Sequence, residues 1–294
     1  SCSKHKKHHK KSHFCKKMKP IRVFIISQEE PFYIPKVIGY LAQHQNQNFE
    51  IVGATRLLPH RKNKTMKDWL LERTQIYSYW EIFITTCFFI YCKVWYKLLS
   101  KFGVFNPFSV KSVYQKYGIN EIETIDINSQ EYIHQLRNLD IDVILSISPP
   151  QLFGKELLNL PKIACLNAHG TLLPRHRGVF GSWWMLYNSD KEIGTTIHTM
   201  VEKLDAGEIV WQKEIPMPTN ATQYSIAYHT KKIMAEGLVE ILIQMNSKGL
   251  LAIQSPYQES YHRAPTKAQG KDFHKKGLRV VTFCNAKLTL SKSF

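Results

Sequence analysis

Continuous apolar stretches alternate with amphipathic stretches along the first half of the chain, and this order predicts an α/β fold. The β-branched and aromatic run at residues 21–26 is typical of a buried parallel strand, and further strands are expected at 49–55 and 140–148. Apolar residues at helical spacing separate these runs, at residues 34–44, 109–117 and 129–139. We therefore expect a Rossmann-like, mostly parallel sheet with helices on both faces. The first strand–helix turn lacks Gly-x-Gly-x-x-Gly, so a dinucleotide site is not predicted.

The second half of the chain continues the pattern with a shorter apolar run at residues 163–166. Further strands are expected at residues 193–200 and 208–214, and helices at 179–187 and from 222 to about 245. Residues 122–127 are expected to form a strand or an extended entry. Beyond residue 254, no series of strand-like runs is long enough for a β-barrel.

Polar side chains follow the run at 163–166, at the strand end where open α/β sheets place their chemistry. Asn167 and His169 stand there, and Asp205 follows later. Asparagine offers an amide donor, histidine donates or accepts a proton, and aspartate accepts or relays one. No serine or cysteine stands beside them in a nucleophile-elbow pattern, so the set suits direct attack by an amine on an acyl carbon.

Each of these side chains also has a plain structural interpretation. Asn167 can fix a turn, His169 can be a bonded structural histidine, and Asp205 can form a β-turn with Gly207. The strand expected at 193–200 carries another histidine, His198, which would take a polar or substrate-facing position.

The loop after His169 carries the features of a binding loop. Arg175 and Arg177 supply positive charge for an anionic group, and Gly178 allows the backbone to approach a ligand closely. We therefore expect this loop to contact a substrate.

Taken together, these residues match a known pattern, Asn-x-His-x-Ser/Thr-x-Leu-Pro with a later Asp-x-Gly. The chain keeps every position of it, with Thr171 in the Ser/Thr place. In this it resembles the folate-dependent formyltransferases, which move a formyl group from 10-formyltetrahydrofolate to an amine. Within that family, residues 167–178 look most like the sugar N-formyltransferases, such as the domain that formylates UDP-4-amino-4-deoxy-L-arabinose. The likeness to methionyl-tRNA formyltransferases is more distant.

The resemblance implies a formyltransferase fold and a set of site residues. The implied catalytic triplet is Asn167, His169 and Asp205, and no metal is expected. The implied contacts with the 10-formyltetrahydrofolate co-substrate are Ile147, Leu152, Leu204 and Gly207. The expected substrate-binding residues are Thr171, Arg175, Arg177 and Gly178.

The acceptor amine remains open at this level. A nucleotide-linked amino sugar is the first hypothesis, and methionyl-tRNA or glycinamide ribonucleotide are alternatives within the same chemistry. Formyltetrahydrofolate hydrolases share the triplet but usually add an N-terminal regulatory domain, which we do not find. A hypothesis of another class is a non-catalytic basic protein that binds RNA or a membrane, although nucleic acid is not our expectation for a chain with the triplet intact.

The chain is expected to have three parts, and the first of them is set apart by its charge. The formal net charge is +17, and residues 1–19 contain eight lysines and no acidic residue. We expect a disordered leader at 1–19, without the apolar core of a secretory signal. A catalytic domain is expected at 20–220, and a helix with a short tail at 221–294. The six cysteines show no Cys-x-x-Cys spacing, which suits reduced thiols and a cytoplasmic protein.

Residues 82–99 form the least expected segment. Its first part is strongly apolar, but Lys93 and Lys97 interrupt it before the ~20 apolar residues that a spanning helix needs. One interpretation is a buried helix or a subunit contact, and hence a homodimer. The other is a helix in a membrane interface, with Trp80 and Trp95 at headgroup level. The basic stretch at 57–67 could face a substrate phosphate, but the plainer interpretation is a solvated loop.

Overall fold

The structure is a computed structural model that describes residues 19–58, 73–102, 108–285, 288 and 294. The leader predicted at 1–19 therefore lies almost entirely outside the described residues, as does most of the basic stretch at 57–67.

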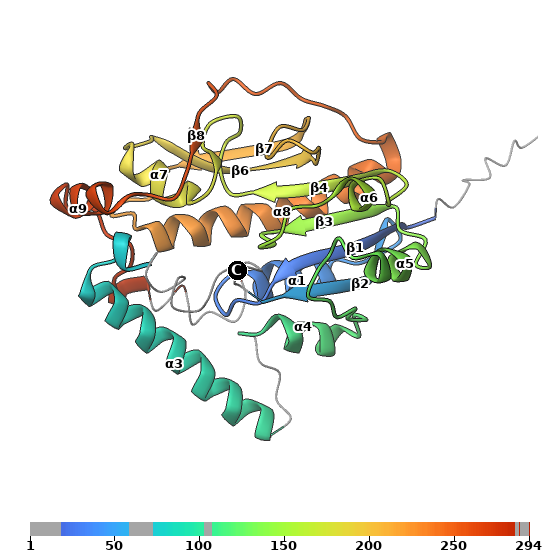
Figure 1. Cartoon of the computed structure of the whole chain (residues 1–294), viewed down its shortest axis with the longest axis horizontal. Coiled ribbons are helices and arrows are strands. Elements are labelled where there is room, and N and C mark those ends of the chain that lie inside the picture. Colours follow the sequence, from blue (N-terminus) through green and yellow to red (C-terminus); the bar gives the residue numbers. More distant parts are fainter. Residues whose placement is uncertain (1–18, 59–72, 103–107, 286–287, 289–293) are drawn as a thin grey trace, which may run out of the picture.

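The core of the fold is a mixed sheet of six strands in the order β2-β1-β3-β4-β6-β7 (Figure 1). Neighbouring strands from β2 to β4 are parallel. The strand β6 is antiparallel to both of its neighbours, β4 and β7. The bounds of these strands are β1 Ile21–Gln28, β2 Phe49–Leu57, β3 Val143–Ile147, β4 Ala164–His169, β6 Glu192–Thr199 and β7 Ile209–Pro216. The expected α/β fold with a mostly parallel sheet is confirmed.

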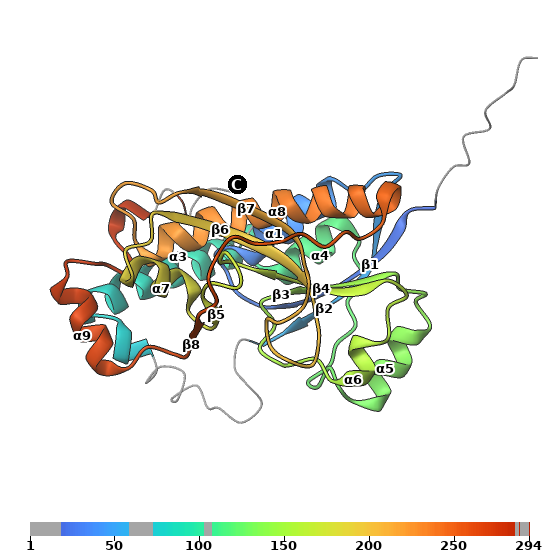
Figure 2. The ribbon, with the colours of Figure 1, turned by 90° about the horizontal axis from the view of Figure 1, so that it is seen from above.

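Helices cover both faces of this sheet, because alternate residues of each strand face opposite ways. Val23 and Ile25 of β1 pack in one cluster with α1, α4 and α8, whereas Phe24 and Ile26 pack in another with α5 and α6. Figure 2 shows the two helical layers on either side of the strands. The bounds of the helices are α1 Ile34–Gln43, α4 Val110–Tyr117, α5 Gln130–Arg137, α6 Lys155–Leu158, α7 Gly181–Tyr187, α8 Gln223–Lys248 and α9 Lys267–Lys275.

Local sequence sets the ends of several helices. Ser109 and Ser129 accept the N–H groups of the third residues of α4 and α5, and Thr222 forms a capping box with Ser225 at the start of α8. Gly118 ends α4 in the left-handed region, where a glycine has no steric penalty. The segment 122–127 forms no strand. It runs in from the Ala54–Glu121 bridge beside β2, and its first residue, Ile122, donates its N–H to the carbonyl of Ala54 at 2.9 Å.

The helix α8, the first element of the part predicted at 221–294, packs in the central core. Met234 and Leu238 are fully buried in the same cluster as β1 and β3, and Ile226 joins a second cluster around Trp183 of α7. The helix therefore ties the two ends of the sheet together.

After α8 the chain returns across the molecule as an extended segment, residues 249–262, which we call the strap. Its two-residue strand β8, Tyr261–His262, pairs in parallel with β5, Arg177–Gly178, in the loop after β4. The 3-10 helix η1, Phe283–Asn285, follows α9 near the end of the described residues. The described part of the tail thus supports the loop after β4.

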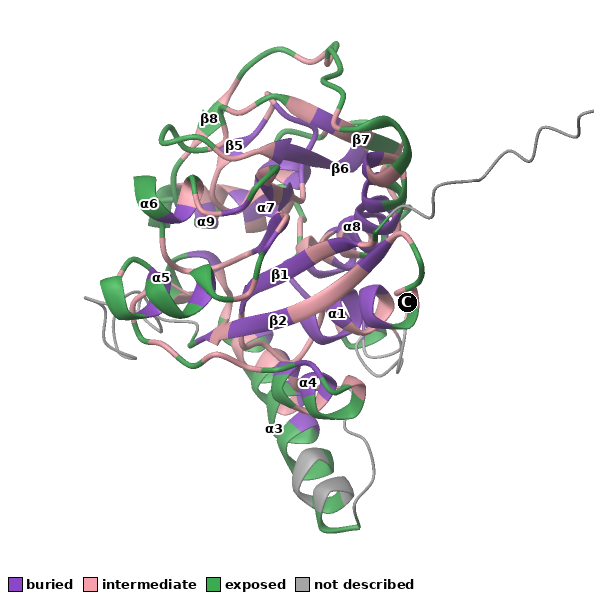
Figure 3. Cartoon of the chain, turned by 90° about the vertical axis from the view of Figure 1, so that its right-hand side faces the viewer, coloured by how far each residue is buried: buried purple, intermediate pink, exposed green. Residues whose placement is uncertain are grey.

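The helix α3, Tyr79–Lys101, extends away from this body (Figure 1). Figure 3 shows it largely in the colour of exposed residues below α4. The expectation of a helix over the apolar segment 82–99 is met, but only one face of its first half, with Ile84, Phe88 and Cys92, is buried. Of the helices in the described ranges, none combines the length and apolar composition needed to cross a bilayer.

Candidate active site

The carboxyl end of β4 delivers two of the predicted catalytic side chains. In the sheet register, Asn167 stands opposite Ser146 of β3 on one side and His198 of β6 on the other. His169 follows two residues later, at the last position of the strand, so it points to the same face as Asn167.

The amide of Asn167 is held in one orientation by its two neighbours. Ser146 Oγ donates to Asn167 Oδ1 at 3.0 Å, and Asn167 Nδ2 lies 3.0 Å from His198 Nε2. His198 Nδ1 lies 2.7 Å from the carbonyl oxygen of Thr199, which can only accept, so Nδ1 carries the proton and Nε2 accepts from Asn167. One Nδ2 hydrogen of Asn167 remains outside this network.

The interior keeps His198 neutral. Its side chain is 2% exposed, and burial, together with the neighbouring His169 and Arg177, lowers the pKa of His198 from 6.5 to about 4. The imidazole therefore stays an acceptor for the amide of Asn167 near neutral pH. Of the two positions expected for His198, polar or substrate-facing, the structure shows the polar one, because the buried ring bonds to Asn167 and to the carbonyl of Thr199.

Asp205 meets both histidines from the opposite side. Its Oδ1 lies 3.8 Å from His169 Nδ1 and 3.8 Å from His198 Nε2, and its Oδ2 accepts the N–H of Gly178 at 2.9 Å. The residue stands in the left-handed region with φ +50°, which aspartate tolerates better than most residues. The three residues of the predicted triplet are thus brought together.

His169 has the more accessible ring of the two histidines. Its side chain is 15% exposed, whereas that of His198 is 2% exposed. The side chain of Asp205 is 4% exposed. His169 Nε2 donates to the carbonyl of His176 at 3.2 Å, which leaves Nδ1 without a proton in the neutral ring. This bare nitrogen faces the carboxylate, so an added proton there would be stabilised by Asp205.

Two of the predicted substrate-binding residues shape the loop after β4. Thr171 is buried, and its hydroxyl donates to the carbonyls of Arg175 at 3.2 Å and His176 at 3.3 Å. Gly178 has φ +99°, and a Cβ there would lie 2.2 Å from the carbonyl oxygen of His262 in the strap. Only glycine fits this pairing. Their contact with substrate stays a prediction.

The two predicted arginines already face carboxylates of the chain. Arg175 Nε lies 3.6 Å from Asp190 Oδ2, and its guanidinium lies over the ring of Tyr257 at 4.5 Å. Arg177 is buried and forms an ion pair with Glu259 of the strap. Because these partners already neutralise much of their charge, both arginines fasten the strap to the loop, whatever they bind besides.

The residues expected to contact folate differ in exposure. Ile147 is fully buried in the central cluster, so it offers a ligand its backbone rather than its side chain. Leu152 and Leu204 are 71% and 41% exposed. Gly207 lies against β6, where a Cβ would come within 1.7 Å of the carbonyl oxygen of Thr199. Folate contact by these residues stays a prediction.

A pair of charged groups lies beside the triplet, at the carboxyl ends of β1 and β3. The Glu30 carboxylate accepts the N–H of Phe32 at 3.0 Å and those of Tyr33, the N-cap of α1, and Ile34, its first residue. Lys231 of α8 donates to Ser148 Oγ at 2.8 Å. Burial raises the pKa of Glu30 and lowers that of Lys231 to about 8. The helix N-terminus where an anion could bind is therefore occupied from within the chain.

Sequence reasoning did not single out Ser146 or Lys231. A hydroxyl inside the otherwise apolar run at 140–148 was a signal for Ser146, since a buried hydroxyl needs a partner. For Lys231, the signal was a cation placed among the apolar positions of a long helix.

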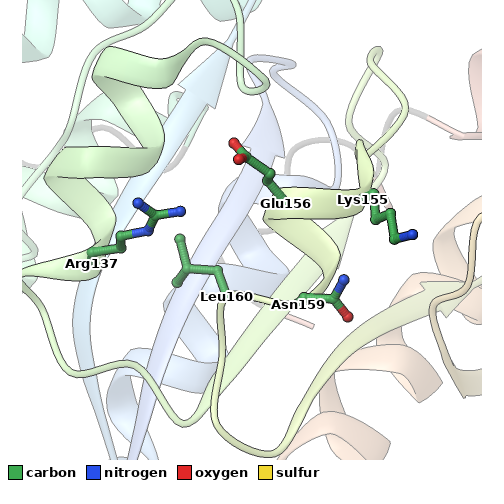
Figure 4. Close-up of a pocket in the computed structure, with 5 residues that line it drawn as sticks. All are labelled: Arg137, Lys155, Glu156, Asn159 and Leu160. Carbon is green, nitrogen blue, oxygen red and sulfur yellow. The ribbon is translucent and has the colours of Figure 1, made fainter.

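A surface hollow of about 400 Å³ lies elsewhere, between α5 and α6 (Figure 4). Its lining residues are Arg137, Lys155, Glu156, Asn159 and Leu160. Asn159 and Leu160 lead into the amino end of β4, so the hollow is at the opposite end of that strand from the triplet. The candidate active site is therefore identified from the contacts of its side chains and not from this hollow. Among the described residues, no group of three or more His, Cys, Asp or Glu side chains could hold a metal ion.

Comparison with known proteins identifies the same region. A formyl transferase family model matches residues 107–242, which include the triplet. Methionyl-tRNA formyltransferase from Thermotoga maritima is 34% identical over 141 residues, 48% of this chain and 45% of that protein. The chain thus spans less than half the length of the curated relatives it matches.

Solved structures share the fold over a longer stretch. Phosphoribosylglycinamide formyltransferase from Anaplasma phagocytophilum superposes with a TM-score of 0.56 at 15% identity, over 83% of this chain and 100% of that one. A sugar 3-N-formyltransferase, solved in the presence of dTDP and 5-N-formyl-THF, superposes with a TM-score of 0.51 at 16% identity, over 82% and 69%.

Proposed function

The chain belongs to the folate-dependent formyltransferase family, and we propose that it transfers a formyl group from 10-formyltetrahydrofolate to the amine of a nucleotide-linked amino sugar. The observation that carries this proposal is the linkage of the three residues: Asp205 Oδ1 lies 3.8 Å from both His169 Nδ1 and His198 Nε2, and His198 in turn accepts from Asn167. Each of the three has a distinct part in the reaction.

The reaction needs no covalent enzyme intermediate. The acceptor nitrogen attacks the formyl carbon and forms a new C–N bond, giving a tetrahedral intermediate with a negative oxygen. The bond from this carbon to N10 of the folate then breaks. The proton lost by the acceptor amine ends on N10, so the products are the formylated amine and tetrahydrofolate.

Asn167 is the proposed donor to the developing oxyanion. Its free Nδ2 hydrogen is available because Ser146 and His198 hold the rest of the amide. Preorganised donors of this kind typically account for about 10²- to 10³-fold in rate. His198 is then a positioning residue, since it acts through Asn167 rather than on the substrate.

His169 and Asp205 are the proposed route for the proton. The bare Nδ1 of His169 faces Asp205 Oδ1, so the ring can take the proton of the attacking amine while the carboxylate stabilises the resulting imidazolium. The N–H of Gly178 on Oδ2 keeps the carboxylate in place during this step.

The donor is proposed to lie against the loops that carry Leu152 and Leu204. Both leucines expose apolar side chains on the side of the sheet where its parallel strands end. A sugar formyltransferase of the same fold was solved in the presence of 5-N-formyl-THF, which supports a folate as the donor. Open α/β sheets commonly bind their ligands at the carboxyl ends of the strands.

The amino sugar is the proposed acceptor on two grounds. The sequence of residues 167–178 resembles the sugar enzymes, and the sugar 3-N-formyltransferase of the same fold was solved with dTDP. Methionyl-tRNA is the second candidate, since the curated relatives named above act on it. The occupied N-terminus of α1 means that an acceptor phosphate would have to bind elsewhere.

Mass spectrometry of candidate acceptors, incubated with the protein and 10-formyltetrahydrofolate, tests the proposal. UDP- and dTDP-linked amino sugars, glycinamide ribonucleotide and methionyl-tRNA would be compared. We expect a gain of one formyl group on an amino sugar, reduced about 10²- to 10⁴-fold in Asp205→Asn. A gain on methionyl-tRNA alone would make methionyl-tRNA, and not an amino sugar, the acceptor. Failure to bind the folate would overturn the assignment as a formyltransferase.

The role of His198 gives a sharper kinetic prediction. His198→Leu removes the acceptor that holds Asn167, so we expect kcat to fall by about 10²-fold, the lower end of the loss of an oxyanion donor. His198→Gln can still accept through Oε1 and should retain more activity. Equal losses in both variants, with folding intact, would show that the bond to Asn167 is not what matters.

A further inference from the structure

The helix α3 exposes an unusual amount of apolar surface. Trp80, Phe83, Ile90, Val94 and Leu98 are 61%, 51%, 55%, 58% and 45% exposed. These residues follow one another at spacings of three, four or seven positions, so they form a single stripe along the helix, which we call the outer stripe. A continuous apolar stripe of this length on a protein surface marks an interaction site.

The outer stripe is distinct from the face by which α3 packs on the body. Ile84, Phe88 and Cys92 are buried, and the first two pack against Tyr224 and Val281. Beyond Cys92, every side chain of α3 that the structure describes is exposed. The helix is thus anchored through its first half, and its second half extends free of the body (Figures 1 and 3).

The charges of α3 select the kind of partner. Its cationic residues are Lys93, Lys97 and Lys101, and its acidic residue is Glu81. Glu81 is buried and accepts the N–H of Val280 at 2.7 Å, so it does not offset the lysines at the surface. The helix therefore presents apolar area flanked by positive charge only, which is complementary to an anionic apolar surface.

A second copy of the chain fits this surface less well. Pairing the outer stripes of two copies would bring two sets of these lysines together, and the chain as a whole carries a net charge of +17. Like charges at an interface oppose association. An anionic lipid surface instead attracts each lysine.

The tryptophans fit the same partner. Trp80 lies at the start of α3, and Trp95, 38% exposed, lies in its second half. Indole rings favour the headgroup level of a bilayer, where one edge is wet and the rest is apolar. Because α3 is neither long nor apolar enough to cross a bilayer, it would lie along the surface.

We propose that α3 docks the protein on an anionic lipid bilayer, with the outer stripe in the headgroup and acyl boundary and the exposed Lys93 and Lys101 on the anionic headgroups. The triplet lies on other elements, with Asn167 and His169 at the carboxyl end of β4 and Asp205 in the loop between β6 and β7, so docking leaves the catalytic residues unchanged. This proposal is independent of the acceptor and of the formyl transfer.

Flotation with vesicles of phosphatidylcholine alone, or mixed with phosphatidylglycerol, tests the proposal on the full chain. We expect the protein to float with the mixed vesicles and to release at high salt. Val94→Glu with Leu98→Glu should weaken binding by more than about tenfold, since both side chains would leave the apolar layer. Each of Lys93→Gln and Lys101→Gln should weaken it about fivefold.

A matched control is Leu251→Glu with Ile253→Glu. These side chains are 52% and 43% exposed and lie outside α3, so the control adds the same charge and should float almost as well as the original chain. Circular dichroism would check that all variants fold. Flotation that persists in Val94→Glu with Leu98→Glu, or that never occurs, would overturn the proposal. A concentration-dependent dimer lost in that variant would identify a second copy as the partner instead.

Discussion

At the scale of single residues, the site depends on which nitrogen of each ring holds a proton. His198 donates from Nδ1 to the carbonyl of Thr199 and accepts at Nε2 from Asn167, so a second proton on its ring would place two donors face to face. Burial opposes that proton. The same burial makes His198 a contributor to the pH dependence of folding.

We predict that His198 lowers the free energy of unfolding as the pH falls. The folded pKa is about 4 and the unfolded value is 6.5, so between these values the unfolded chain binds a proton that the folded chain rejects. Stability is therefore unaffected above pH 6.5 and declines as the pH falls toward 4, by about 3 kcal/mol at most. Urea unfolding of the chain and of His198→Gln, compared between these pH values, measures the difference. Parallel losses in both would contradict the prediction.

At the scale of elements, two segments far apart in the chain hold the catalytic loops. The strap pairs with β5, and Arg177 joins both segments, since it forms an ion pair with Glu259 and donates to the carbonyl of Leu204 at 2.7 Å. Leu204 precedes Asp205, so the strap bears on the position of the carboxylate. Close packing of Gly207 on β6 fixes the other end of the same turn.

Gly207→Ala is predicted to displace the loop that carries Asp205. A Cβ there would overlap the backbone carbonyl of Thr199, which cannot move without disturbing β6. We expect a loss of about 1–3 kcal/mol in unfolding free energy and a larger relative loss in activity. Gly39→Ala is the control. It lies inside α1 with no atom within 4 Å of its added Cβ, and should be neutral or stabilise by up to about 1 kcal/mol. Full activity in Gly207→Ala would disprove the close fit.

At the scale of the whole molecule, α8 makes one cooperative unit of the sheet and both ends of its core. Leu145 of β3 lies in the central cluster, and α8 contributes Ile226 to the cluster around Trp183 and Met234 to the central cluster, so one helix packs in both. Local opening of one cluster would break the packing of the other.

Leu145→Ala and Ile226→Ala are therefore predicted to shift the same single unfolding transition. Both side chains are fully buried, so each truncation should cost about 2–5 kcal/mol. Leu251→Ala, at an exposed side chain, should change stability by less than about 0.5 kcal/mol. Denaturant unfolding followed by circular dichroism and by tryptophan fluorescence would measure this. Two separated transitions in either core variant would refute a single unit.

The sequence by itself determined the sheet, most helix bounds and the placement of Asn167 and His169 at a strand end. Strands and helices follow from local periodicity, and Asn167 and His169 follow directly after an apolar run, so their placement at a strand end needs no distant contact. The Asp205 motif could be attached to this site because the resemblance to a family supplied the link that spacing alone does not.

Only the tertiary structure decided what each polar side chain faces. The buried bond from Asn167 to His198 spans 31 positions, and the ion pair from Arg177 to Glu259 spans 82, so neither is visible in a local pattern. Burial is also a property of the assembled layers. Ile147 and the outer stripe of α3 are equally apolar in the sequence, yet one is covered by helices on a sheet face and the other projects beyond it.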